Sequence, residues 1–502
     1  MQTRYALSFL IILLLIQAPG ASSQNTNTQL NINAVDAYIA NKMRWPRIPG
    51  MAVAIVKDDR IAYLKGYGEA DPSGRPVTPQ TPFILGSVTK AFTALAVMQL
   101  VEAGKVELDA PVQKYIPWFR TADAAASAQI TVRQLLYQTS GLPMLREPQL
   151  LTDQDAGALE RTVRSFAHAH LDHPPGQTFA YSNANYDTAG LIVQMVSGMS
   201  YEEYVKQHIF APLDMKNSFA SQAEAMNHGM AMGHRWWFGF PVGVTFPYLR
   251  SELPAGYLIS SAEDMAHFLI AEMNGGHYQN STMLSSDGVA LTHTAPATQT
   301  YAMGWQRIEV DGRLLITHDG GTGHFETSVF FDPDERVGVF VAMNVMSALD
   351  AFASPAGPDP LDGVSIRAIA QSVSNLATDR PLPDQGRGIR RLYAVFDLVI
   401  VVLSTLIVIS FVRIGRRYKR WRHRGIASWP SFGWRTIIKA VSHFTLPLLI
   451  LYLAVKVPLW GVLVMLQPDL AYWLVAVAVV LLVKGVIELT LMTRVFRQTY
   501  AR

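Results

Sequence analysis

Three long apolar segments close the 502-residue chain, and they limit its possible folds more than any other feature of the sequence. The segments span residues 392–412, 440–466 and 470–492. A helix needs about 20 predominantly apolar residues to cross the hydrocarbon core of a bilayer, and each segment is long enough. We therefore predict a transmembrane bundle over residues 391–502, with membrane lipid as its partner, and a globular domain before it.

The connection between the first two apolar segments, residues 413–439, carries nine Lys and Arg and no Asp or Glu. Because short basic connections remain on the cytoplasmic side, we predict a cytoplasmic loop there and an extracytoplasmic globular domain in a multi-pass cell-membrane protein. Of the chain's 42 basic and 39 acidic residues, the part from Arg391 onward holds 15 and 3, which leaves 27 and 36 for the rest. The globular part is thus acidic, and no nucleic-acid partner is expected.

Residues 1–23 have the pattern of a secretory signal peptide: Arg4, an apolar run over 6–16, and small residues at Ala21 and Ser23. An uncleaved anchor helix is the alternative, and either one exports the chain that follows. Residues 378–390 are rich in Pro, Gly and charge, which predicts a linker. The globular domain then covers residues 24–377. It has no cysteine, which excludes a thiol nucleophile and disulfides.

Strand patterns lie at both ends of this domain. Runs at 52–56 and 60–64 flank a turn at 57–59 and predict a hairpin. Residues 89–103 show helical periodicity, with Gly104 just past the end. Further strands are predicted at 303–308, 314–317, 327–331 and 337–343. Strands from both ends with helices between them predict one sheet packed against helices, an α/β (α+β) fold.

The first chemical motif is Ser87-Val88-Thr89-Lys90, where the long helix begins. Three-residue spacing puts Ser87 and Lys90 on one helical face. A neutral lysine can accept the serine proton, and burial beside other cations favours that form. The helix start also offers N–H groups to a developing oxyanion. Taken alone, the pattern equally describes a capping serine followed by a surface lysine.

Two further motifs follow along the chain. Tyr181-Ser182-Asn183 offers a phenol that can relay protons and an amide that can bind a substrate carbonyl. His318-Asp319-Gly320-Gly321 places two glycines on a predicted edge strand, where a substrate backbone can approach and an N–H can complete an oxyanion hole. Alone, the first is a common loop tripeptide and the second a tight turn.

In this order, the motifs S-x-x-K, Y-x-N and H-x-G resemble those of the serine β-lactamase and penicillin-binding protein superfamily. Residues 130–143, residues 254–265 and the pair Gly304-Trp305 also look like segments of this family. The resemblance covers roughly residues 35–375. It implies a β-lactamase/transpeptidase-like antiparallel sheet flanked by helices, with a helical subdomain.

The resemblance also implies roles for the motif residues. Ser87 is then the nucleophile, Lys90 its activating base and Tyr181 the proton relay. Asn183 contacts the substrate amide, and the N–H groups of Ser87 and Gly321 form the oxyanion hole. Substrate-binding positions are Asn183, His318, Gly320 and Gly321.

The third motif departs from the family's commonest pattern. His318 stands where many β-lactamases have lysine, and it resembles a class C-like branch with DD-carboxypeptidases, D-amino-acid-peptide hydrolases and esterases. Asp319 replaces the more usual Thr or Ser. We expect its carboxylate to repel a substrate carboxylate, which counts against penicillin-type substrates.

The resemblance implies a membrane-anchored extracytoplasmic serine hydrolase that forms an acyl-enzyme on Ser87. Its small-molecule or peptide substrate would be an amide or an ester, as for a peptidase, a β-lactamase or an esterase. The alternative is a catalytically silent sensor that binds penicillin or peptidoglycan and is coupled to the bundle; intact Ser87, Lys90 and Tyr181 favour the enzyme. We expect no cofactor and no metal, because His168, His170 and His173 lack acidic partners at ligand spacing. The oligomeric state is left open.

Overall fold

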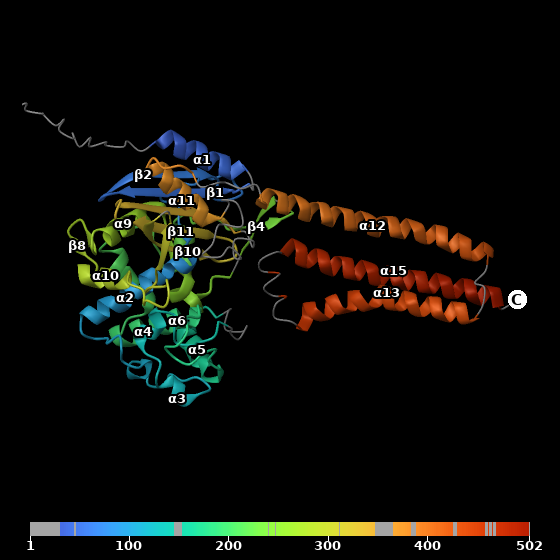
Figure 1. The fold of residues 1–502 in the computed structure, drawn as a ribbon, viewed down its shortest axis with the longest axis horizontal. Coiled ribbons are helices and arrows are strands. Elements are labelled where there is room, and N and C mark those ends of the chain that lie inside the picture. Colours follow the sequence, from blue (N-terminus) through green and yellow to red (C-terminus); the bar gives the residue numbers. More distant parts are fainter. Residues whose placement is uncertain are drawn as a thin grey trace, which may run out of the picture.

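The computed structural model describes residues 31–44, 47–144, 153–238, 240–245, 247–310, 312–346, 365–382, 388–424, 429–456, 460, 464 and 468–500. The predicted signal peptide, residues 1–23, lies outside these ranges, as does part of the predicted linker. A globular domain is followed by three long helices that extend to one side of it (Figure 1).

The centre of the globular domain is an antiparallel sheet with the strand order β2-β1-β12-β11-β10-β9. Its strands are β1 (Gly50–Lys57), β2 (Arg60–Gly68), β9 (Gln306–Val310), β10 (Arg313–Gly321), β11 (Glu326–Asp332) and β12 (Val337–Met343). The predicted hairpin and the single sheet built from both ends of the domain are confirmed. The strand predicted at 303–308 begins later, at Gln306, because Gly304 has a φ of +79° and turns the chain.

Helices cover both faces of this sheet (Figure 1). Alternate residues of β1 explain how: Met51, Val53 and Ile55 join one apolar cluster, and the alanines between them join the other. The first cluster includes α1 (Ile32–Arg44) and α11 (Ile366–Ala377). The second includes α2 (Thr89–Glu102), α6 (Asn183–Ser197) and α9 (Ala262–Met273).

The helical subdomain lies on the α2 side of the sheet. Its shorter helices are α3 (Ala124–Ser127), α4 (Val132–Leu136), α5 (Ala158–Ser165), α7 (Tyr201–Val205), α8 (Gln222–Asn227) and α10 (Ser286–Thr292). Small sheets are formed by β3 (Phe83–Ile84) with β6 (Ile259–Ser260), β7 (His277–Tyr278) with β8 (Ser281–Thr282), and β13 (Val345–Met346) with β4 (His234–Trp237) and β5 (Phe240–Gly243). Helix α2, predicted from the periodicity of residues 89–103, is buried on nearly every side.

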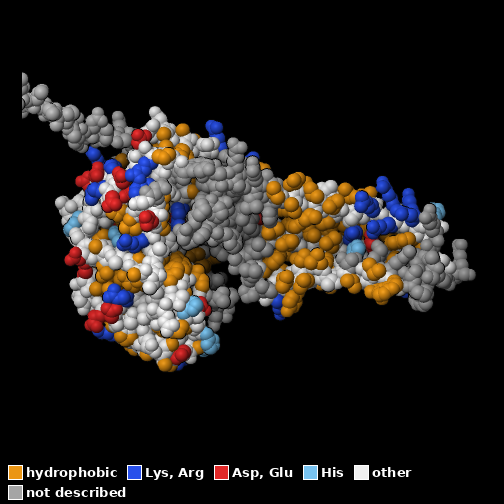
Figure 2. All heavy atoms as spheres, in the orientation of Figure 1, with side chains coloured by type: hydrophobic (Ala, Val, Ile, Leu, Met, Phe, Trp, Pro, Cys, Tyr) orange, Lys and Arg blue, Asp and Glu red, His pale blue; other side chains and the backbone are white. Residues whose placement is uncertain are grey.

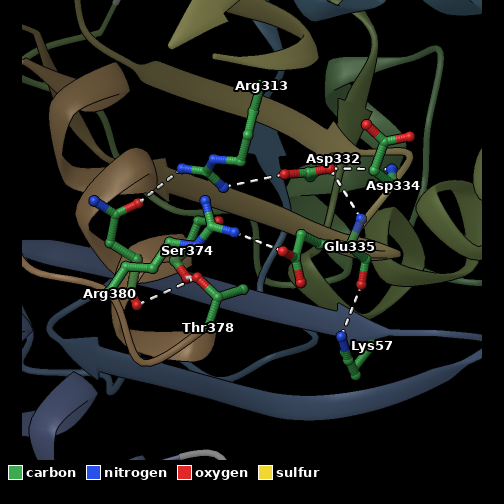
Figure 3. A network of polar contacts seen from close by, with 9 residues as sticks. Lys57, Arg313, Asp332, Asp334, Glu335, Ser374, Thr378 and Arg380 are labelled. Atoms are coloured by element: carbon green, nitrogen blue, oxygen red, sulfur yellow. Dashed lines mark hydrogen bonds and ion pairs between the residues drawn. The ribbon is translucent and has the colours of Figure 1, made fainter. Parts of the chain in front are cut away.

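A polar network fixes the end of the globular domain to the sheet (Figure 3). Arg313 Nη1 donates to the buried carboxylate of Asp332 at 3.0 Å. Arg380 pairs with Glu335, whose backbone oxygen accepts from Lys57 Nζ at 2.7 Å. The globular domain therefore extends to at least Arg380, beyond the predicted start of the linker.

The three long helices are α12 (Gly388–Arg424), α13 (Trp429–Lys456) and α15 (Pro468–Tyr500). They contain apolar spans at Asp397–His423, Thr436–Lys456 and Asp469–Thr499, each long enough to cross a membrane. In the apolar stretch of each span, at most 17% of the residues are buried. Their outer surface is broadly apolar (Figure 2). Such a surface fits contact with lipid rather than with water. Residues 413–424, predicted as loop, instead continue α12 as helix, which carries its basic side chains away from the globular domain.

Candidate active site

Ser87 lies in a single 3-10 turn, Gly86–Val88, that leads directly into α2. Gly86 has a φ of +56°, and a Cβ added to it would lie 2.4 Å from the backbone nitrogen of Gly321. Only glycine allows the turn to approach β10 this closely. Thr327 Oγ1 donates to Leu85 O at 2.6 Å and ties the turn to β11. Ser87 is thus held between the sheet and the start of α2.

Lys90 is fully buried on the first turn of α2 and reaches Ser87. Its Nζ lies 3.1 Å from Ser87 Oγ, 2.8 Å from Asn183 Oδ1 and 2.6 Å from Ala255 O. The last of these acceptors belongs to a π-type turn, Leu253–Tyr257. The structure therefore brings the first two motifs together, and Lys90 is not a surface lysine.

Tyr181 completes this group. Lys90 Nζ lies 4.9 Å from the centre of the Tyr181 ring. Burial raises the pKa of the Tyr181 phenol well above its usual value, while a hydrogen bond with Ser87 lowers it. The net shift is upward, so the phenol keeps its proton at neutral pH and is available as a donor.

The segment 130–143 holds the Tyr181 motif in place. Ser182 N donates to Gln138 Oε1, and Ser182 Oγ donates to Pro143 O, both at 3.0 Å. Ala180 N donates to the backbone oxygen of Gln138 at 2.9 Å. Ser182 also caps α6 by accepting from Ala184 N. These bonds fix the backbone on both sides of Tyr181.

Asn183 is oriented by Glu252, a residue that the sequence reasoning missed. Asn183 Nδ2 donates to Glu252 Oε2 at 3.0 Å, and its Oδ1 accepts from Lys90. Glu252 is only 9% exposed. Its carboxylate can only accept when ionised, so it selects the amide orientation that offers oxygen to the lysine. Its position in the sequence could have indicated it, since Glu252 lies two residues before the segment 254–265, which already resembled the family.

His318 is buried on β10 and faces the same site. Its Nδ1 donates to Asp319 O at 2.7 Å, which leaves Nε2 to accept from Tyr301 OH at 3.2 Å. Burial lowers the pKa of His318 to about 4. The imidazole is therefore neutral at pH 7 and does not replace the cation that a lysine supplies at this position.

The expectation that Asp319 repels a substrate carboxylate is wrong. Its side chain pairs with Arg367 of α11 and accepts from Ser328 Oγ at 2.7 Å. Successive side chains of a strand point to opposite faces, so Asp319 faces α11 while His318 faces the site. Its charge is balanced there by Arg367.

Gly320 and Gly321 lie inside β10, which continues past the strand predicted at 314–317. A Cβ on Gly320 would lie 2.0 Å from Leu85 O and 2.9 Å from Ser87 N. In the described part of the chain, the pairing of β10 with β9 ends at Thr317 opposite Gln306, although β10 itself is not an edge strand. Residues 318–321 thus lie close to Ser87, and their β9-facing edge extends beyond the pairing with β9.

The structure gives no metal centre within the residues it describes: no group of three or more His, Asp and Glu there could hold an ion. His168, His170 and His173 are all exposed.

We expect the domain to lose stability as the pH falls from about 6.5 to about 4. His318 and His324 are buried, and burial lowers the pKa of each to about 4. The unfolded chain titrates near 6.5 and so binds protons first, at a cost of about 3 kcal/mol per histidine when complete. His324→Gln should flatten the dependence of the unfolding midpoint on pH over this range. The exposed His168→Gln is the control, and equal slopes in both variants would contradict the assignment.

The chain belongs to the beta-lactamase family, whose model matches residues 35–356. Protein flp of Staphylococcus aureus (strain MW2) is 28% identical over 394 residues, which cover 78% of this chain and 75% of the relative. Penicillin-binding protein 4 of Amycolatopsis lactamdurans is 30% identical over 289 residues, or 55% of this chain and 75% of the relative. The octameric penicillin-binding protein homologue from Pyrococcus abyssi superposes with a TM-score of 0.59 at 27% identity, covering 72% of this chain and 80% of that one. The predicted superfamily and fold class are confirmed.

Proposed function

We propose that the protein is a membrane-anchored extracytoplasmic serine hydrolase that works through an acyl-enzyme on Ser87, with an amide or ester substrate. The observation that carries the proposal is the grouping of three side chains: Lys90 Nζ lies 3.1 Å from Ser87 Oγ and 4.9 Å from the centre of the Tyr181 ring. A nucleophile within reach of a base and of a proton donor is the arrangement that acyl transfer needs.

In the proposed reaction, Ser87 Oγ attacks the carbonyl carbon of the substrate and its proton passes to the neutral amine of Lys90. The negative oxygen of the tetrahedral intermediate accepts hydrogen bonds from the N–H groups of Ser87 and Gly321. The proximity of Gly321 N to the turn at Gly86 supports this role. When the C–N or C–O bond breaks, Tyr181 protonates the leaving group and recovers a proton from Lys90. Water then attacks the Ser87 ester, releases the acid and restores the hydroxyl.

The distribution of charge on the helices supports the extracytoplasmic position. Lys and Arg side chains gather at the end of the bundle farthest from the globular domain (Figure 2). Because basic ends of membrane helices remain in the cytoplasm, this end faces inward and the globular domain faces outward.

A topology reporter tests this orientation. An enzyme that is active only outside the cytoplasm should be active when fused after Gln467 and silent when fused at Ser428. The physical reason is the run of nine Lys and Arg between residues 413 and 439, which resists translocation. The opposite pattern of reporter activity would reverse the arrangement.

Turnover of a substrate panel tests the reaction class. We expect the full-length protein in detergent to hydrolyse at least one member of a set of chromogenic β-lactams, D-Ala-D-Ala peptides and short-chain esters. The pairing of Asp319 with Arg367 removes the objection to substrates with a carboxylate. A protein that is acylated but turns over none of them would instead fit the penicillin- or peptidoglycan-binding sensor.

A further inference from the structure

The hairpin of β4 and β5 exposes large apolar side chains next to the helical bundle. Phe238 is 40% exposed, Phe240 55% and Val242 42%. Phe240 and Val242 share one face of β5, because side chains two apart on a strand point the same way. On the neighbouring strand, Trp236, paired with Pro241, is buried in the core. The hairpin therefore keeps one aromatic residue inside and presents others outward.

This hairpin contacts the first turn of α15. Phe238 N donates to Asp469 Oδ2 at 3.0 Å. The Trp237 ring stacks on that of Tyr472, with centroids 5.7 Å apart and planes at 13°. Asp469 is the first residue of the apolar span Asp469–Thr499, so the hairpin lies at the height where this helix would enter the bilayer. Figure 1 shows β4 on the side of the globular domain that meets the bundle.

We infer that the β4–β5 hairpin docks into the headgroup region of the same bilayer that the bundle spans, with Phe238, Phe240 and Val242 in contact with phospholipid. Continuity with the bundle favours lipid over a protein partner, because a bilayer around α15 begins at the residues that the hairpin touches. Aromatic side chains concentrate at this depth in membrane proteins. Arg47 adds a matching charge, since its guanidinium lies 4.4 Å from the centre of the Phe240 ring, where it can meet lipid phosphate.

Docking of the hairpin would also fix the distance of the candidate active site from the membrane surface. Arg235 Nε of β4 donates to Gly323 O at 3.3 Å, two residues beyond Gly321. Gly323 N in turn contacts Met346 of β13, the strand that pairs with β4. The glycine end of β10 is thus tied to the membrane-facing hairpin. Under the proposed function, this geometry suits a substrate held at the membrane surface; the docking itself does not depend on that function.

The absence of cysteine from the chain allows a direct test. Phe240→Cys in the full-length protein is labelled with an environment-sensitive fluorophore and reconstituted in phosphatidylcholine–phosphatidylglycerol vesicles. Val242→Cys is a second probe on the same face. Met195→Cys is the matched control: it is 44% exposed and lies near the end of α6. Ser197, the last residue of α6, lines one hollow with Met283, which follows β8, and Figure 1 shows β8 on the side of the domain farthest from the bundle.

We expect the labels at 240 and 242 to emit at shorter wavelength than the label at 195. Lipids with a quencher near the headgroup should lower their emission, and aqueous iodide should lower only that of the label at 195. Equal access of iodide to all three labels, without quenching by lipid, would overturn the inference. Protection from both quenchers would overturn it as well, because it would mean that protein covers the hairpin.

Discussion

A serine-directed fluorophosphonate should add one covalent mass to a peptide that contains Ser87, and Ser87→Ala should abolish the addition. The expected loss is complete, because the reaction needs the oxygen that Lys90 Nζ contacts at 3.1 Å. Serines without a base in reach react slowly with such reagents. Mass spectrometry of the labelled, digested full-length protein measures both the mass and its site.

Ser87→Ala should leave the fold intact, so that loss of labelling reports on chemistry. The 3-10 turn at Ser87 has no side-chain cap, and the lost hydrogen bonds cost about 1 kcal/mol. An unchanged unfolding midpoint, within a few degrees, is the control. Labelling that survives in the variant would place the nucleophile elsewhere. No labelling of the wild-type protein by any acylating probe would favour the sensor.

The features that the sequence predicts well are those that depend on residues close together in the chain. Ser87 and Lys90 are three residues apart, so helix geometry alone brings them to one face. The strands around β1 and β12 are equally local, since alternation and turn residues define them. The three apolar spans follow from length and hydropathy alone.

The contacts that complete the site are not local. Glu252 reaches Asn183 across 69 residues, and Arg367 reaches Asp319 across 48. Which face of β10 each side chain occupies depends on the helices that cover the sheet, and no periodicity within residues 318–321 contains that information. This is why the effect of Asp319 was predicted wrongly: the sequence shows an acid beside His318 but not the arginine that neutralises it.

Residues 413–424 were predicted as loop for a different reason, which is that hydropathy does not mark the end of a helix. Arg and Lys have good helix propensity, so charged residues after an apolar span can extend a helix rather than end it. Residues 413–424 do this in α12. Hydropathy marks where lipid contact ends, which is a different boundary from the end of the helix.

Lys90→Met should slow the reaction before the adduct forms, whereas Tyr181→Phe should let the adduct form, more slowly where the leaving group needs a proton, and then persist. Lys90→Met removes the amine that accepts the Ser87 proton, so acylation by a labelled penicillin or fluorophosphonate should slow by about 10²–10⁴-fold. Tyr181→Phe leaves Lys90 in place but removes the phenol beside Ser87. If Tyr181 also serves the attacking water, the acyl-enzyme should form and then persist, and its lifetime after a chase should lengthen by a similar factor.

The two variants control for one another, since both change a residue at the same site. Lys90→Met leaves Asn183 Oδ1 and Ala255 O without the donor that they share, so some loss of stability is expected and is measured by thermal unfolding. Asn183 retains its bond to Glu252, which keeps the amide near its original position. A folded Lys90→Met protein that acylates at the wild-type rate would exclude the lysine as the base. A Tyr181→Phe adduct that decays as fast as the wild-type adduct would exclude the phenol from deacylation and assign the water's activation to another group at the site.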